Sequence, residues 1–427
     1  MSWFSSKSEK NSAESSGKQN FFPVTASHHG FGALTEQDTT WSCANNRGFQ
    51  TETQVWYSVL GDGSLLLVQV IWTYLGVFVV PATAQMTFKY YNPHTKQATW
   101  KSINASGFKP HGRGCKSDQF EIKHTGTPEG EESYEVTASL DKNVQISVSF
   151  NRPASAPGFK LGSGPTGGIS TFGTHVEDGK RDGFVVHRFH PMCQSTGSIV
   201  IDGEAIDTKG EATFIHAIQG MRPDTLATRW NFAFFSSGGG KEESKLGSVR
   251  AVQMEFETTD SYGLNGAKSG RVKVNVGAIY ASALNPQAYL VVGQASSGPA
   301  SESTPESSEI CSAQHFGGLK DSHTGYSAPT AIEYKWSGAS RAEKSTQTSA
   351  QLKVENLTIT EGEGGLIEKV NVLAEIPYVI RKALSAATGT KPYIYQYLNP
   401  ATLKVDIAGE STDVQGWLFN EASFVSQ

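Results

Sequence analysis

From residue 55 to the C-terminus, apolar and polar residues alternate with a period of two in many short stretches. Met86, Phe88 and Tyr90, for example, are separated by Thr87 and Lys89. Because successive side chains of a strand point to opposite faces, each such run predicts a strand with one buried and one solvent-facing side. The alternation recurs at residues 144–150, 252–256, 272–276, 332–336 and 403–407.

Turn-forming dipeptides separate these runs. Gly61–Gly63, Asp182–Gly183, Asp202–Gly203 and Asn265–Gly266 are typical of tight connections between antiparallel strands. The 427 residues also include 44 Gly, 22 Phe, 14 Tyr and 8 Trp, a composition that favours turns and pleated sheets. There is more strand than one small barrel can use. We therefore expect an all-β protein of two consecutive antiparallel barrels.

Composition also suggests where the domains begin and end. Residues 1–45 are predicted to be a disordered N-terminal segment, because the first 20 are rich in Ser, Lys, Glu and Asn. The first barrel is expected in 46–182, ending in a Gly-, Pro- and Ser-rich linker at 153–179. The second is expected in 183–427, with a disordered insertion at 295–308.

One helix is predicted near the C-terminus. Ile376, Val379, Ile380, Ala383 and Leu384 have the spacing of a single helix face. A short amphipathic helix of this kind packs on a barrel wall, or alternatively serves as a lid or a membrane contact.

A second apolar stretch, Leu65 to Val80, is too short to span a membrane. It has 16 residues where about 20 are needed, and it contains Gln69 and Thr73. We interpret it as buried strand broken near Gly76.

Charge and cysteine content narrow the function classes. The net charge is −5 and no Lys/Arg cluster is present, which argues against a nucleic-acid partner. Residues 1–20 lack a secretory signal pattern. The four isolated cysteines, Cys43, Cys115, Cys193 and Cys311, are expected to be reduced thiols in a cytoplasmic compartment.

Motifs of catalysis and metal binding are weak. Residues 162–167 (GSGPTG) match a dinucleotide fingerprint in form, but Pro165 interrupts them and strand-like sequence follows, so we expect an inter-barrel loop. His187 and His190 lie three apart on a predicted strand and would point to opposite faces. We predict no catalytic residues, no metal site and no cofactor.

Two residue sets are candidates for lipid binding. Trp56, Trp72 and Phe88 lie on strands of the first barrel, where aromatic side chains either fill the core or line a ligand cavity. A polar-aromatic cluster around the sequence RWN either receives a polar ligand headgroup or closes the barrels through hydrogen bonds. Its members are His216, Arg222, Arg229, Trp230 and Asn231.

Several longer segments resemble the fungal survival-factor family, the "cell survival pathways" proteins. Together they extend from about residue 50 to the C-terminus. The matching segments are Gly167–Ser170, His187–Pro191, His216–Pro223, Arg229–Phe232, Glu255–Phe256, Tyr262–Gly263, Ala374–Pro377, Gly389–Tyr397 and Glu421–Phe424.

The resemblance implies two lipocalin-like (calycin) barrels that carry ceramide, a sphingolipid, from endoplasmic reticulum to Golgi outside vesicles. It also implies a role in survival under oxidative stress, with cytoplasmic, nuclear and membrane-peripheral residence. Family members attach to membranes through an acetylated amphipathic N-terminal helix. In this chain only Trp3 and Phe4 are large and apolar there, so weak membrane contact is expected.

Two other functions remain open. By analogy with bacterial carotenoid hydratases of similar fold, the chain could be an enzyme acting on a hydrophobic substrate, with His216 or Glu255 as proton donor. It could also be a stress-signalling scaffold whose barrels are filled by their own side chains. Co-purified unmodified lipid would support the carrier, and a converted product would support the enzyme. Barrels that hold no ligand and are filled by their own side chains would support the scaffold.

Overall fold

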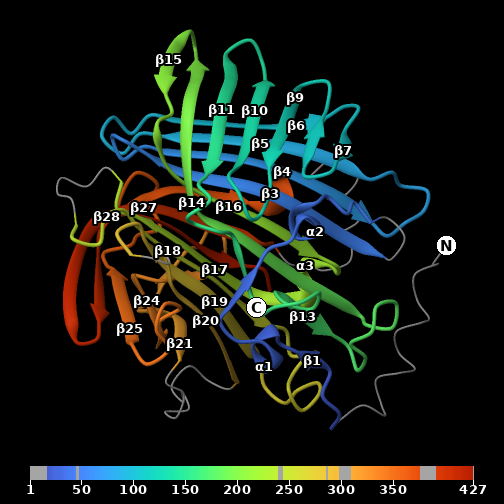
Figure 1. Ribbon diagram of the computed structural model, residues 1–427. Coiled ribbons are helices and arrows are strands. Elements are labelled where there is room, and N and C mark those ends of the chain that lie inside the picture. Colours follow the sequence, from blue (N-terminus) through green and yellow to red (C-terminus); the bar gives the residue numbers. More distant parts are fainter. Residues whose placement is uncertain are drawn as a thin grey trace.

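The computed structural model describes residues 17–44, 48–238, 244–284, 287–297, 309–375 and 391–426. Nearly all regular structure in these ranges is β, arranged as two large antiparallel sheets (Figure 1). One sheet curves into an open half-barrel and the other into a nearly closed barrel. This confirms the expected all-β fold class of two consecutive barrel-like sheets.

The half-barrel is built mainly from the first half of the chain. Its path of hydrogen-bonded neighbours is β6 (Ala98–Ala105), β5 (Thr83–Tyr91), β4 (Leu65–Leu75), β3 (Phe49–Leu60), β16 (Gly210–Gln219), β14 (Gly183–Ile201), β11 (Val144–Arg152), β10 (Glu132–Ser139), β9 (Phe120–Gly126), β8 (Gly114–Lys116) and β7 (Lys109–His111). Short strands pair beside this path: β1 (Phe21–Phe22), β2 (Phe31–Ala33), β12 (Phe159–Leu161), β13 (Ile169–Phe172) and β15 (Glu204–Asp207).

The second sheet is built from the rest of the chain. Its path is β20 (Ala288–Ser297), β19 (Val272–Ala281), β18 (Val249–Thr258), β17 (Ala227–Ser236), β28 (Glu410–Phe424), β27 (Tyr393–Ile407), β25 (Gln347–Val354), β24 (Ala331–Ala339) and β21 (Ile310–Phe316), with β26 (Leu366–Asn371) beside β27. The end strands β20 and β21 meet through the Cys311 amide, which donates to Gln294 Oε1 at 3.2 Å. That contact brings the barrel close to closure.

The remaining elements are short. They are the helices α1 (Val24–Ser27), α2 (Glu36–Thr39), α3 (Pro223–Leu226) and α4 (Val372–Glu375), and a hairpin of β22 (Leu319–Lys320) and β23 (Ser327–Ala328). No helix in the described ranges is long and apolar enough to cross a bilayer. The helix expected at 376–384 lies outside the described residues, as do Trp3 and Phe4.

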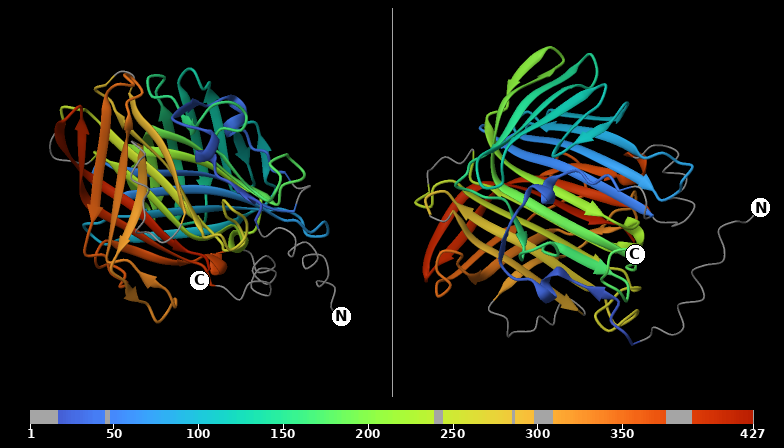
Figure 2. Two further views of the ribbon diagram at one scale, coloured as in Figure 1. Left: turned by 90° about the horizontal axis from the view of Figure 1, so that it is seen from below. Right: turned by 45° about the vertical axis from the view of Figure 1, so that its right-hand side comes forward.

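The buried side chains form three layers. One core fills the half-barrel and a second fills the closed barrel. A third lies between the two sheets, where the outer face of β3 and β16 packs on the outer face of β17, β18 and β19. Figure 2 shows the blue-to-green half-barrel lying across the yellow-to-red barrel. The strands that face the other sheet therefore bury one face in their own core and the second face between the sheets.

Several sequence expectations are confirmed. Val144, Ile146 and Val148 of β11 are buried while Gln145 and Ser147 are exposed. Residues 65–75 form β4, and the chain leaves the strand at Gly76, whose φ is +76°. All four cysteines are free thiols.

The domain boundaries differ from the expected ones. The change of sheet falls between β16 and β17, not at 182/183, because β14 starts at Gly183 and pairs with β11 and β16 of the first sheet. The predicted linker at 153–179 contains β12 and β13, which pair with β14. The predicted insertion at 295–308 overlaps the end of β20, and residues 298–308 lie outside the described ranges.

The N-terminal segment also differs. Residues 17–44 were expected to be disordered, but they form α1, α2 and two short strands against the first sheet. Phe21 and Trp41 are buried, and the Asp38 carboxylate accepts from Lys160 Nζ and Arg188 Nε at 2.9 and 2.6 Å. A few well-placed apolar groups and one buried ion-pair cluster thus order a segment whose average composition is polar.

Candidate functional site: a cavity between the two sheets

A cavity of about 390 Å³ lies between the half-barrel and the closed barrel. This volume falls in the range of small-molecule sites, about 300–1,000 Å³. Strands β3, β4, β5 and β16 form one wall, and β17, β18, β27 and β28 form the other. The lining includes Phe49, Thr51, Thr53, Val55, Tyr57, Leu67, Thr73, Lys89, Trp100, His187, Ile215, Ala217, Trp230, Phe232, Met254, Gln396 and Glu421.

Strand β3 shows how the sequence builds this wall. Val55 and Tyr57 point between the sheets, whereas Trp56 points into the half-barrel core. Trp56 packs there against Phe150 and Phe214, with ring centroids 5.4 and 5.0 Å apart. The period of two therefore assigns alternate residues of one strand to the cavity and to the filled core.

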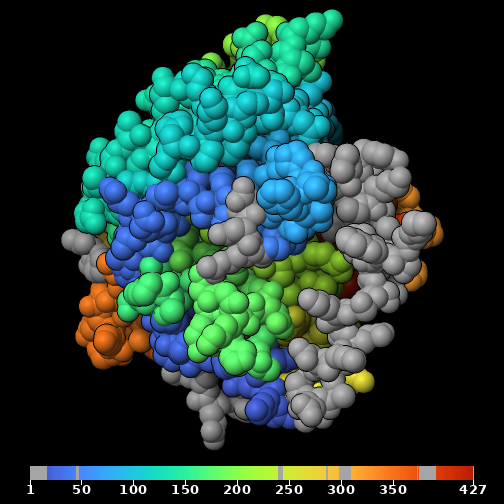
Figure 3. Space-filling view, turned by 90° about the vertical axis from the view of Figure 1, so that its right-hand side faces the viewer, coloured from blue at the N-terminus to red at the C-terminus, as the bar shows by residue number. Residues whose placement is uncertain are grey.

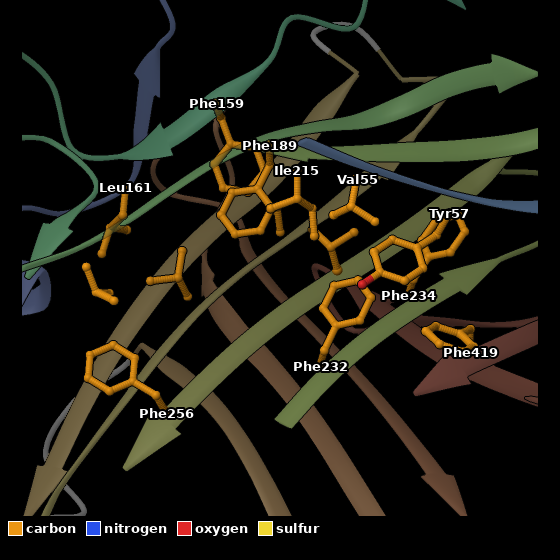
Figure 4. Close-up of a cluster of buried hydrophobic side chains, with 14 of the residues drawn as sticks. Val55, Tyr57, Phe159, Leu161, Phe189, Ile215, Phe232, Phe234, Phe256 and Phe419 are labelled. Atoms are coloured by element: carbon orange, nitrogen blue, oxygen red, sulfur yellow. The ribbon is translucent and has the colours of Figure 1, made fainter. Parts of the chain in front are cut away.

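The apolar part of the cavity is aromatic. The ring of Tyr57 lies 4.8 Å from that of Phe232 and 5.2 Å from that of Phe419. Figure 4 shows Val55, Tyr57, Ile215 and Phe232 meeting from opposite sheets. An aliphatic chain placed against this surface leaves water at about 0.8 kcal/mol per CH₂.

A polar group is set into the same cavity at Lys89. The Lys89 ammonium is buried, lies 2.6 Å from the Glu368 carboxylate and sits 4.0 Å above the Trp100 ring. It also donates to Gln396 Oε1. Gln396 Nε2 in turn donates to Glu421 Oε1 at 2.7 Å. These groups offer both donors and acceptors to a bound molecule.

The protonation of Glu421 is shifted by its surroundings. Burial raises the pKa of its carboxyl, and the Gln396 amide and the Lys89 ammonium oppose that shift. A carboxyl that keeps its proton can donate a hydrogen bond to a carbonyl or hydroxyl. The cavity can thus hold an amide and hydroxyls at one place and apolar chains elsewhere.

His187 is the other titratable group on the wall. Burial, and then the charge of Arg188, lowers its pKa to about 3. Its ring lies 5.9 Å from Trp230 in an edge-on arrangement. His190, three residues on, faces the half-barrel core and lies 3.5 Å from Glu132. Among the described residues, no group of His, Cys, Asp and Glu is arranged to hold a metal ion.

The structure separates the lipid-binding candidates chosen from the sequence. Trp230 lines the cavity. Trp56, Trp72 and Phe88 lie together in the filled core of the half-barrel. They share strands with the cavity wall but point to its other side.

The residues of the predicted polar cluster around the RWN sequence do not form one cluster in the structure. His216 bonds Glu52 Oε1 through Nε2 and the Asp38 carbonyl through Nδ1, both at 2.9 Å, which fastens β16 to the N-terminal segment. Arg229 pairs with Glu257 at 3.1 Å.

Asn231 lies on the opposite side of β17 from Trp230. Its Nδ2 donates to Glu255 Oε1 at 2.7 Å, and its Oδ1 lies 2.7 Å from His315 Nε2. Neither Glu255 nor His216, the proton donors considered from the sequence, is among the residues that line the cavity.

Sequence reasoning missed Tyr57, Phe232, Lys89, Gln396 and Glu421. A signal existed in β3 and β17, where apolar residues occupy both alternating positions, because such strands are buried on two sides. Nothing in the sequence pairs Lys89 with Gln396, which are 307 positions apart.

The sequence profile of the Svf1 family matches residues 1–426. The chain belongs to this family. This confirms the resemblance drawn from the motifs. The chain is 29% identical over 418 residues to ceramide-binding protein svf1 of Schizosaccharomyces pombe, covering 96% of this chain and 95% of that protein. It is 27% identical over 398 residues to ceramide-binding protein svf-1 of Neurospora crassa, covering 92% and 89%.

Solved structures with a related arrangement are more distant. Kievitone hydratase from Nectria haematococca aligns with 96% of this Svf1-family chain and 99% of its own, at 11% identity and a TM-score of 0.47. A likeness at this level carries no information about ligand or reaction.

Proposed function

We propose that this Svf1-family chain is a carrier that binds ceramide in the cavity between its two sheets, without a covalent step. The observation that supports this most is the cavity lining, which combines an aromatic and aliphatic wall with one buried set of donors and acceptors. Ceramide has the matching parts, because its amide and hydroxyls are compact and its two chains are apolar.

The bound orientation follows from the cost of burying polar atoms. An amide or hydroxyl taken out of water needs a partner, and Gln396 and Glu421 provide partners inside the cavity. The chains would then lie along Val55, Phe232 and Met254. The names of the relatives point to the same ligand.

The route of transport is part of the proposal. Transfer from endoplasmic reticulum to Golgi, peripheral contact with those membranes, and support of survival under oxidative stress are taken over from the family resemblance. Six lipid-binding candidates from the sequence would act on this site indirectly, through the cores and the ion pairs that hold its walls. They are Trp56, Trp72, Phe88, His216, Arg229 and Asn231.

Ceramide transfer between donor and acceptor vesicles tests the proposal. Trp230→Ala should reduce transfer, because it removes a ring from the cavity wall. Trp417→Ala is the matched control, since Trp417 packs on the inter-sheet core from outside the cavity lining. Equal transfer by both folded variants would refute the placement of ceramide in this cavity. No ceramide in native mass spectra of the wild type would refute the carrier.

An enzyme of the hydratase type is the second candidate. It is favoured by one observation, the raised pKa of Glu421, because a protonated carboxyl beside an apolar cavity can deliver a proton to a double bond. Such a reaction adds water across the bond, so lipid recovered from the protein would gain the mass of one water. Unchanged lipid would exclude it.

A further inference from the structure

The turn between β4 and β5 carries an exposed apolar tip. Phe78 is 96% exposed, Val79 82% and Val77 39%. Single exposed apolar residues are ordinary on soluble proteins, but three in a row at the end of a hairpin mark an interaction site. Elsewhere in the described ranges the large exposed apolar side chains are isolated: Val176, Ile310 and Leu319.

The turn is held in shape rather than loose. The Val80 amide donates to the Val77 carbonyl at 2.9 Å. Gly76 has a φ of +76°, and a Cβ there would meet the Gly48 backbone at 2.5 Å, so the turn is braced against the start of β3. Pro81 follows and fixes the backbone further. A preformed tip loses little conformational freedom when it is buried.

Charged residues are missing from the turn and from the adjoining parts of both strands. Residues 65–88 contain no Asp, Glu, Lys or Arg. Insertion of the tip into an apolar medium would therefore desolvate no ion, which is the most costly part of such a transfer. The free backbone groups of the turn limit the depth to the interfacial zone of a bilayer, where water still reaches them.

The tip stands at one end of the cavity. Phe49 pairs with Leu75 and Thr73 pairs with Thr83, and these are the last pairs of β3–β4 and β4–β5 before the turn. Phe49 and Thr73 both line the cavity. Figure 3 shows the light-blue turn on the same face as α3, which contributes Pro223 and Asp224 to the lining.

From this placement we propose that the β4–β5 turn, residues 76–82, inserts into the surface of a lipid bilayer and brings this end of the cavity against it. The proposal rests on the carrier function above and gives it a membrane contact separate from Trp3 and Phe4. A lipid entering or leaving the cavity then passes beside the tip rather than through water.

A bilayer fits the tip better than a second copy of the chain. A stable protein interface buries about 800 Å² on each partner, and three side chains on a narrow hairpin end provide much less. A bilayer surrounds each inserted side chain on all sides, so a small tip gains the full burial of Phe78, Val77 and Val79.

Vesicle flotation tests the proposal with the full-length chain. The double variant Phe78→Ser, Val79→Ser should lower partition onto phosphatidylcholine–phosphatidylethanolamine vesicles about tenfold or more. Leu319→Ser is the matched control, because Leu319 is an exposed apolar residue on the separate β22–β23 hairpin. Because the contact is apolar, wild-type partition should persist in high salt.

The two proposals fail separately. Ceramide offered on cyclodextrin reports the cavity alone, and the tip variant should bind it as the wild type does. Loss of flotation with ceramide binding retained supports the tip, and absence of ceramide binding in both proteins refutes only the carrier. Unchanged flotation of the tip variant, or a change confined to its oligomeric state, overturns the membrane contact.

Discussion

Filling the cavity should weaken lipid binding strongly without unfolding the protein. Ala217 is suited to this, because it lies on β16 opposite Thr53 and lines the cavity with a side chain that is not fully buried. Ala217→Trp would place an indole where the lipid chain is expected. A matched control is Ala98→Trp, the same change at an exposed position of β6.

The size of the effect follows from the displaced chain. If the indole takes the place of about four methylenes, at about 0.8 kcal/mol each, binding weakens by about 3 kcal/mol, or about two-hundredfold in Kd. Ala217→Val fills less of the space and should weaken binding less. The wild type, Ala217→Val and Ala217→Trp therefore form a graded series in which affinity for ceramide falls as the volume of the side chain at position 217 rises.

Titration with ceramide on cyclodextrin, followed by native mass spectrometry, measures this series. Thermal unfolding of each variant shows whether the fold is kept, and both tryptophan variants should melt close to the wild type. A folded Ala217→Trp protein that binds ceramide with wild-type affinity would show that the lipid lies elsewhere.

Three further predictions concern the buried polar groups. Glu421→Gln should bind ceramide nearly as the wild type does, because an amide can still donate, whereas Glu421→Leu should weaken binding about tenfold; equal affinities would remove this group from the headgroup contact. Glu132→Gln should lower the free energy of unfolding by about 3–5 kcal/mol in urea titrations, since it leaves Arg113 and Arg152 buried without their carboxylate. Burial lowers the pKa of His187 to about 3, so the native state takes up its proton later than the unfolded chain and stability falls as pH drops below about 6.5. His187→Gln should reduce that slope by about 1.4 kcal/mol per pH unit in denaturant titrations, and an unchanged slope would contradict a buried neutral imidazole.

Much of the local structure could be predicted from the order of residue types. The strands at 65–75 and 144–152 follow from hydrophobic runs and alternation, and the turn at Asp202–Gly203 follows from residues that tolerate positive φ, here +50° and +87°. These features depend on neighbours in sequence. The family, too, was readable from motifs spread along the chain.

The place of the candidate site could not be predicted in the same way. Alternation in β18 was expected to turn Val252 and Phe256 inward and Gln253 and Glu255 outward. In the structure Val252 and Phe256 face the inter-sheet core, while Gln253 bonds Asn275 and Glu255 bonds Asn231 on the opposite side of the strands. The polar face is buried as well, and its hydrogen bonds come from neighbouring strands.

The sequence by itself determined that this chain forms two-faced strands, keeps its cysteines as free thiols and has an Svf1-family fold. Only the tertiary structure decided that the barrels are filled and that a cavity lined by Tyr57, Phe232, Lys89 and Gln396 lies between them. The physical reason is that alternation of residue types along a strand shows only that the strand has two different faces. What covers each face depends on strands hundreds of residues away, and the local order of residue types does not identify those strands.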